Sequence, residues 1–289
     1  MSCLPAPRTG LAGGVAPLVD RDSGTQRLIP DMGGMESTKQ EMSGDENEKL
    51  HPFGDKHMNS QNSRINNTKR IGVGLSFIIF PLIFVFAFAG HPNLLDPHFL
   101  GPAELIQRAR NQTLLHFGHA LVTLCTGLLV VVALHFMNTL KNTKAEWFGL
   151  FGGVIAIFGA LMLAADKGAL CLTMSALDTL PEDKFSTMMP GLLAMFGKEG
   201  WLILIWGMVL LPIGFVIQAV GLLKSRILAT WQSTLFLVGV IFIGTPDGVE
   251  IINLAAAVAI AIALIPYGLT LLTSATSRIE SPASPPDTR

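Results

Sequence analysis

Apolar residues along this chain come in long runs that are separated by shorter polar connections. An α-helix needs a run of about 20 apolar residues to cross a hydrocarbon core of roughly 30 Å. The fifth apolar run, residues 228–244, is short for a bilayer. At a rise of about 1.5 Å per residue, a helix of this length spans only some 25 Å. The pattern predicts six membrane-spanning helices, at residues 70–89, 113–137, 147–165, 198–223, 228–244 and 249–273.

The segment before the first run has neither helical nor strand periodicity. Residues 1–67 hold too few large apolar side chains to offset the entropy of ordering, so we expect a disordered cytoplasmic tail there. A second, short disordered cytoplasmic tail is expected at 275–289. The predicted fold is therefore all-α, a polytopic helical membrane protein whose six-helix transmembrane bundle occupies residues 68–274.

The longest connection, residues 168–197, contains two short apolar pieces, 169–177 and 188–196, on either side of a polar turn. Neither piece is long enough to cross a bilayer. We expect them to form either interfacial helices lying on the membrane, which is the favoured arrangement, or a lid over the mouth of the bundle. Asp166 and Lys167 are expected to end the third helix just before this connection.

Small residues recur along one face of the third predicted helix, at Gly149, Gly153, Ala156 and Ala160. Small side chains let helix backbones approach closely in lipid. This ridge therefore predicts a helix-packing face rather than a functional site.

Composition and charge fit this membrane assignment, since 50% of the residues are hydrophobic and only 14% are charged. The basic flanks at Lys69, Lys141 and Lys224 place both termini in the cytoplasm, and the plasma membrane is the expected location. Arg108 and Arg110 lie on the outer side in this scheme and are exceptions to the rule. Lysines and arginines form no basic face, so the lipid bilayer rather than nucleic acid is the expected partner.

The second predicted helix carries a polar stripe made of His116, His119, Thr123 and Thr126. Their spacings of three, four and three place them on one helix face, with leucines and valines on the others. We expect this stripe to face protein rather than lipid.

Ionisable residues at the outer ends of four predicted helices fall at one level under this topology. A charged group at membrane depth is costly, and pairing, metal binding or a wet cavity can offset the cost. The sequence therefore predicts an outward-facing polar site. Its members are His116 and His119, Asp166 and Lys167, Lys198 and Glu199, and Asp247 and Glu250.

Two histidines three residues apart can supply nitrogen ligands to a divalent metal, which suggests a more specific site. His116 and His119 would then need a carboxylate from another helix, such as Asp247 or Glu250, with Asp166 as a further alternative. A metal hydrolase would also need an open coordination position for water.

Haem b is a second cofactor hypothesis, because transmembrane histidines are its usual axial ligands. It fits less well, since His116 and His135 lie at opposite ends of one predicted helix. No other predicted span contains a histidine, so His91 or His98 would have to fold back from the outer loop.

Every member of the polar site also has a simpler explanation. Asp247 and Glu250 have the spacing of a capping box at the start of a helix. The acid–lysine pairs on the third and fourth helices can form ordinary interfacial salt bridges. The two histidines can be satisfied by hydrogen bonds to loop carbonyls.

Motifs that would name a reaction are missing from the sequence, so whether the protein is an enzyme is left open. Transport is one alternative, since Pro81 and Pro212 interrupt the first helix of each half, as in a transporter of small solutes with inverted repeats. A structural or assembly subunit that packs with other membrane subunits is another.

Overall fold

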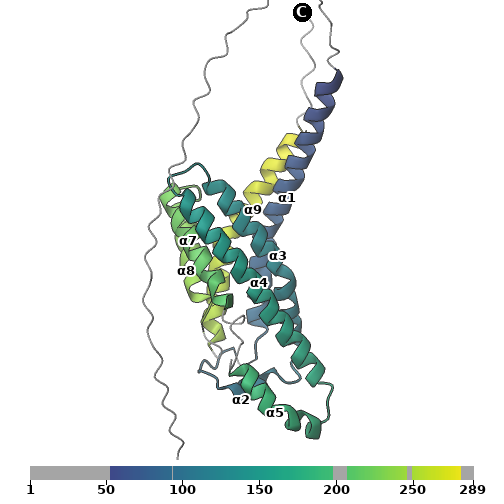
Figure 1. Cartoon of the computed structure of the whole chain (residues 1–289). Coiled ribbons are helices and arrows are strands. Elements are labelled where there is room, and N and C mark those ends of the chain that lie inside the picture. Colours follow the sequence, from purple (N-terminus) through teal and green to yellow (C-terminus); the bar gives the residue numbers. More distant parts are fainter. Residues whose placement is uncertain (1–52, 93, 198–206, 246–248, 281–289) are drawn as a thin grey trace, which may run out of the picture. The chain divides into compact units, whose positions relative to one another are not determined.

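The computed structural model describes residues 53–92, 94–197, 207–245 and 249–280, and these ranges contain helices and no strand. The predicted all-α class is therefore confirmed for the described part of the chain. The helices, shown in Figure 1, are α1 (Phe53–Ala89), α2 (Pro102–Ala109), α3 (Thr113–Leu140), α4 (Glu146–Leu177), α5 (Glu182–Phe196), the 3-10 helix η1 (Gly207–Val209), α7 (Leu210–Ser225), α8 (Thr230–Phe242) and α9 (Glu250–Glu280).

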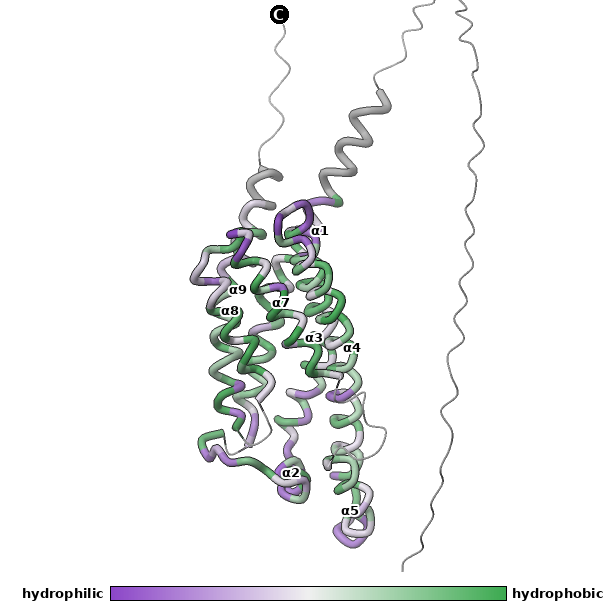
Figure 2. Tube along the Cα trace, turned by 60° about the vertical axis from the view of Figure 1, so that its left-hand side comes forward, coloured by the Kyte–Doolittle hydropathy of each residue, from purple (hydrophilic) through white to green (hydrophobic). Residues whose placement is uncertain are grey.

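Five of these segments are long and apolar enough to cross a membrane, which confirms the helical membrane class. They are Ile65–Ala89, Thr113–Leu140, Glu146–Leu177, Gly207–Ser225 and Glu250–Ser274. The fifth expected span, 228–244, corresponds to α8, whose 13 residues extend only about 20 Å. Figure 2 shows that hydrophobic residues predominate along the spanning helices, and that hydrophilic residues gather around α2 and at the tip of α5.

Three predicted helix boundaries are wrong, and the three helices are longer than expected. α9 continues to Glu280, so residues 275–280, which we expected to be disordered, are helical. α1 begins at Phe53, so residues 53–67, which we expected to be disordered, are helical. α4 continues through Asp166 and Lys167 to Leu177 instead of ending there. Hydropathy marks where a helix leaves the hydrocarbon, but an established helix propagates until a residue stops it. In α4 the first proline after the span is Pro181, beyond the end of the helix.

The connection predicted between the third and fourth spans is correspondingly different. Its first apolar piece, 169–177, is the last part of α4, and only the second piece belongs to a separate helix, α5. α5 packs against α2. Together with the adjoining ends of α3 and α4, they form a second, small core at the end of the bundle. The buried residues of that core are Ile106, Ala109, Leu115, Met174, Leu177, Phe185 and Leu192.

The glycine and alanine ridge of α4 packs as predicted. Gly149, Gly153, Ala156 and Ala160 are all buried. The neighbouring Gly159 is the tightest position, because a methyl group there would overlap the backbone of α7 at Leu211. α4 therefore lies between α3 and α7, as seen in Figure 1.

The other close helix pairs use the same device. α1 runs beside α9, where a methyl group on Gly268 would lie 2.8 Å from the carbonyl oxygen of Gly74. α8 packs on α9, where a methyl group on Gly239 would lie 2.7 Å from Ile260. Small residues at helix crossings thus bring the described spans into one bundle.

One buried amide joins three spans in the middle of the bundle. Gln218 on α7 is 0% exposed, and its Nε2 donates to the carbonyl oxygens of Ala133 on α3 (3.0 Å) and Gly149 on α4 (3.3 Å). Hydrogen bonds between membrane helices hold their faces in register, because an unpaired polar group in hydrocarbon is costly. Gln218 therefore fixes how α3, α4 and α7 meet.

Candidate functional site

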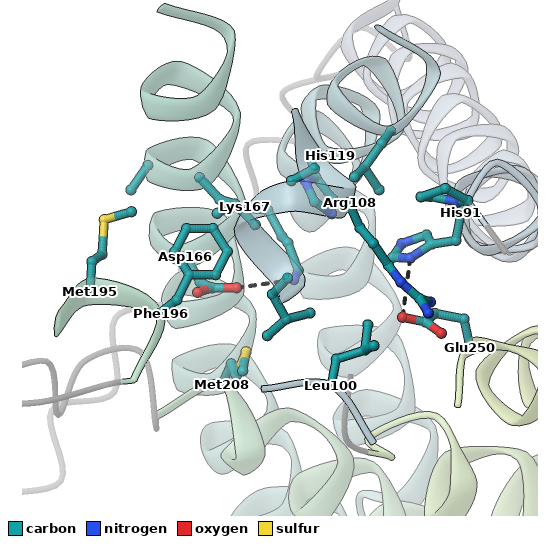
Figure 3. Close-up of a pocket in the computed structure, with 16 residues that line it drawn as sticks. His91, Leu100, Arg108, His119, Asp166, Lys167, Met195, Phe196, Met208 and Glu250 are labelled. Carbon is teal, nitrogen blue, oxygen red and sulfur yellow. Dashed lines mark ion pairs between the residues drawn. The ribbon is translucent and has the colours of Figure 1, made fainter. Parts of the chain in front are cut away.

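The bundle contains a cavity of about 140 Å³ at the end where α2 and α5 lie. Its walls come from segments far apart in the sequence, as Figure 3 shows. The loop after α1 contributes His91, Pro92 and Leu100, α2 contributes Leu105, Arg108 and Ala109, α3 contributes Leu115 and His119, α4 contributes Asp166, Lys167, Ala169 and Leu170, α5 contributes Met195 and Phe196, η1 contributes Met208, and α9 contributes Glu250.

His119, His91 and Glu250 form one polar wall of this cavity. The rings of His91 and His119 meet edge to face with centroids 5.9 Å apart. His91 Nδ1 lies 3.7 Å from Glu250 Oε1, the ion pair drawn in Figure 3. His119 is 7% exposed, and its Nδ1 has no hydrogen-bond partner among the described residues. The cavity thus contains a buried imidazole nitrogen with nothing in the described chain to satisfy it.

Arg108 lies on the cavity wall, and its guanidinium forms ion pairs with two carboxylates outside the cavity. Its Nη2 lies 3.4 Å from Glu104 Oε1 and 3.8 Å from Asp96 Oδ2, and both carboxylates lie in exposed segments before or within α2. Its Nη1 is buried and has no partner in the described part of the chain. Ion pairs at one nitrogen therefore orient the guanidinium, while the other nitrogen is left unpaired.

His98 completes the outer cluster around Arg108. Its Nε2 donates to Glu104 Oε1 at 2.9 Å, and this hydrogen bond raises the pKa of His98 above its usual value of 6.5. Arg108 Nη2 lies 3.1 Å from the same nitrogen, which cannot accept a hydrogen bond while it carries the proton. Arg108 therefore pairs with the carboxylates, and His98 supports Glu104 from the solvent side.

Asp166 and Lys167 lie on the opposite wall, within α4. Lys167 Nζ is 3.2 Å from Asp166 Oδ2, so these neighbours pair with each other. The predicted pairing with Lys198 and Glu199 across adjacent helices concerns two residues outside the described ranges. Lys167 neutralises Asp166 locally, which reduces the cost of placing a carboxylate beside the cavity.

His116 does not share a site with His119, although the two lie on the same helix face as predicted. Its Nε2 is 2.8 Å from Asp178 Oδ2, just after the end of α4, and its backbone carbonyl accepts a hydrogen bond from Cys171 Sγ. The pair His116–Asp178 therefore joins α3 to the extended part of α4, outside the set of residues that line the cavity.

The threonines of the predicted stripe do not extend the site either. Thr123 Oγ1 donates to the carbonyl oxygen of His119, and Thr126 Oγ1 donates to that of Thr123. Both hydroxyls are satisfied within α3. The polar stripe thus ends at His119, where it meets the cavity.

Glu250 is the first residue of α9, as a helix-start role would require, and it is 6% exposed. Its carboxylate nevertheless lies beside His91 on the same wall of the cavity. Asp247, the other half of the predicted capping box, lies outside the described residues.

No group of three or more His, Cys, Asp or Glu side chains within the described ranges could hold a metal ion. The contacts show why: His116 is hydrogen-bonded to Asp178, whereas the His119 ring meets the ring of His91, which in turn lies 3.7 Å from Glu250. The predicted set of His116, His119, Asp247 and Glu250 stays a prediction, because Asp247 is not described. The haem hypothesis gains no support from His135, whose Nε2 is hydrogen-bonded to Tyr267 Oη at 2.9 Å.

Two cavity residues, His91 and Arg108, are not members of the predicted polar site. The sequence suggests His91 only as a haem ligand, because no periodicity marks a residue in a loop. Arg108 did carry a signal in the sequence. The predicted topology places this arginine on the outer side of the membrane, where the rule for basic residues expects few of them. A cation that violates the topology rule is a candidate for a specific electrostatic role.

Comparisons with models of known protein families, with curated proteins and with solved structures give no match to this chain. The function therefore has to be argued from the cavity and the side chains that line it.

Proposed function

We propose that this protein binds a small amphipathic molecule in the cavity at the α2–α5 end of its bundle, and that this end faces the outer side of the membrane. The observation that carries the proposal is His119, a buried side chain that lines the cavity with an unpartnered Nδ1 in the described structure. A buried polar atom without a hydrogen bond costs roughly 1–3 kcal/mol, and a bound group would remove that cost.

The lining supports an amphipathic occupant. Ionisable side chains from α2, α3, α4 and α9 stand on the walls together with leucine, methionine and phenylalanine side chains such as Leu170, Met195 and Phe196. Binding pockets for small molecules combine apolar walls with a few polar groups that fix the orientation of the ligand.

The volume of the cavity fits the same proposal. Space for one water occupies about 10–15 Å³ on a measure of this kind, and the cavity has about 140 Å³. It can therefore hold a small organic group rather than a single water or ion.

The outward orientation rests on the basic flanks. Lys141 follows the end of α3, and Lys224 lies 4.3 Å from the ring of Phe148 at the start of α4, so these lysines belong to the end of the bundle away from His119. Basic residues near membrane helices favour the cytoplasmic side. The cavity end is then outside.

Divalent metal binding is the second candidate, because a metal could draw together His91, His119 and Glu250, which do not form a metal-binding group in the described structure as it stands. Zinc-type sites are built from imidazole and carboxylate groups.

The transport alternative is not favoured by the helices that suggested it. Pro81 lies inside α1, which continues without a break, and Pro212 lies in the first turn of α7, where proline is tolerated. Broken helices in both halves were the basis of that hypothesis.

Mass-spectrometric analysis of the small molecules that co-purify with the protein would test the binding function. Ala169 is exposed and lines the cavity, so Ala169→Trp should fill the mouth without disturbing the core. Ala165 lies one turn earlier on α4, is also exposed, and does not line the cavity. We expect about one amphipathic molecule per chain in the wild type and in Ala165→Trp, and loss of most of it in Ala169→Trp.

Identical profiles in the three proteins would contradict the proposal. Elemental analysis of the same samples separates the second candidate, because about one divalent ion per chain that is lost in His119→Ala would favour the metal site instead.

A further inference from the structure

We infer that the ligand of this cavity carries a single carboxylate head group, as a medium-chain fatty acid does, held by Arg108 and His119. The inference rests on the proposed binding function and names the chemical class of its ligand. It comes from which polar atoms of the cavity are already paired and which are not.

The unpaired atoms are nitrogens on two different elements. Arg108 Nη1 on α2 and His119 Nδ1 on α3 are both buried, and neither has a hydrogen-bond partner in the described ranges. An arginine nitrogen can only donate, and an imidazole nitrogen donates when it carries the proton. With the His119 proton on Nδ1, the cavity offers two donors, which a group with two acceptor oxygens would satisfy.

Within the described chain, only one of the two terminal guanidinium nitrogens of Arg108 has a partner. Its Nη2 lies beside Glu104 and Asp96 outside the cavity, and these ion pairs favour the orientation in which Nη1 stays buried. A carboxylate would accept from Nη1 in a charge-assisted hydrogen bond, which is roughly twice as strong as a neutral one.

The other charges of the cavity limit the ligand to one negative charge. Asp166 is paired with Lys167 at 3.2 Å, and Glu250 lies 3.7 Å from His91. Each acid therefore already has a basic side chain beside it. Both still line the cavity and would repel a dianion such as a phosphate monoester. A monocarboxylate has the two acceptor oxygens that the donors need with the smaller repulsion.

The tail of such a ligand has an apolar wall to lie against. Leu115, Leu170 and Phe196 come from α3, α4 and α5 and line the same cavity as the two donors. Figure 3 shows Phe196 and Met195 on the α5 side and His91, Arg108 and Glu250 on the other. An acid head and a hydrocarbon tail match this division of the lining.

Calorimetric titration of the protein in lipid nanodiscs, with empty nanodiscs as background, tests the head group on the unaltered chain. The probes share one eight-carbon tail: octanoate, octan-1-ol, octylammonium and octyl phosphate. Octanoate should bind at least about tenfold more tightly than each of the other three. Tighter binding of octan-1-ol, octylammonium or octyl phosphate would overturn the carboxylate assignment.

Variants assign the binding to the two donors. Arg108→Gln and His119→Gln should each weaken octanoate binding by about tenfold while changing octan-1-ol binding little. Arg110→Gln is the matched control, because Arg110 lies two residues away on the same segment but pairs with Glu182 and stacks over Phe185 outside the cavity. Equal weakening in Arg110→Gln would overturn the role of Arg108.

The proposed function and this inference fail in different ways. Saturable binding of octan-1-ol or octylammonium that Ala169→Trp abolishes, with no preference for octanoate, would keep the binding site and overturn its carboxylate specificity. Binding of no probe, or binding that Ala169→Trp leaves unchanged, would overturn both.

Discussion

At the scale of single residues, the two histidines of α3 show how one helix face can serve two purposes. His116 and His119 are three residues apart, yet His116 is hydrogen-bonded to Asp178 and His119 faces the cavity with a free Nδ1 in the described structure. The spacing correctly placed both side chains on one face that is buried in protein. It could not say which acid each imidazole would meet, because Asp178 lies 62 residues further along the chain.

The pair His116–Asp178 should be structural. Asp178→Ala leaves a buried imidazole without its partner, so we expect the free energy of unfolding in mixed micelles to fall by about 2 kcal/mol while octanoate binding is retained. Asp183→Ala, which removes an exposed acid from the first turn of α5, should change it by less than about 1 kcal/mol. Loss of ligand binding in Asp178→Ala without loss of stability would move His116 into the binding site.

At the scale of elements, the close contact between α4 and α7 is what positions the cavity walls. Asp166 and Lys167 come from α4, and Met208 lies in η1 at the start of α7, so both walls move if this contact loosens. The contact depends on glycines such as Gly159 and Gly214. A larger residue cannot replace them, because backbone atoms of the partner helix occupy the place where its side chain would lie.

Two glycine substitutions of equal size should therefore have opposite effects. Gly159→Ala places a methyl group in the backbone of α7 and should lower the unfolding free energy by about 3 kcal/mol or more. Gly127→Ala on α3 has open space and should raise it by up to about 1 kcal/mol through helix propensity. Chemical unfolding of both variants in the same micelles is the measurement. Similar values for the two would show that α4 and α7 do not pack as closely as described.

At the scale of the whole molecule, the orientation in the membrane decides from which side a ligand enters. The basic flanks predict that the turn between α3 and α4 is cytoplasmic and that the loop before α2 is outside. Lys144 is exposed in the first, and Leu95 is 84% exposed in the second.

Cysteine labelling in intact cells tests this orientation. In a background without Cys3, Cys125 and Cys171, Leu95→Cys should react with a maleimide that cannot cross the membrane. Lys144→Cys should react only after permeabilisation. The reverse pattern would place the cavity on the inner side and leave its chemistry unchanged.

The sequence by itself determined the properties that depend on each residue and its near neighbours. Apolar run lengths established the helical membrane class, and the small-residue spacing of α4 identified its packing face. These signals are local, because partition into hydrocarbon and helix periodicity are read within one segment. Helix ends were less well determined, since propagation beyond the membrane depends on where the chain is finally stopped, as at Leu177.

Only the tertiary structure decided which polar residues meet. His91, Arg108, His119 and Glu250 lie in four segments, and nothing in the spacing along the chain relates the loop after α1 to the start of α9. Their convergence follows from the packing of whole helix faces, in which α1 lies against both α3 and α9. Hydropathy places polar groups at a membrane level, but the partner of each group is fixed by contacts between segments distant in sequence, and those contacts form only when the bundle does.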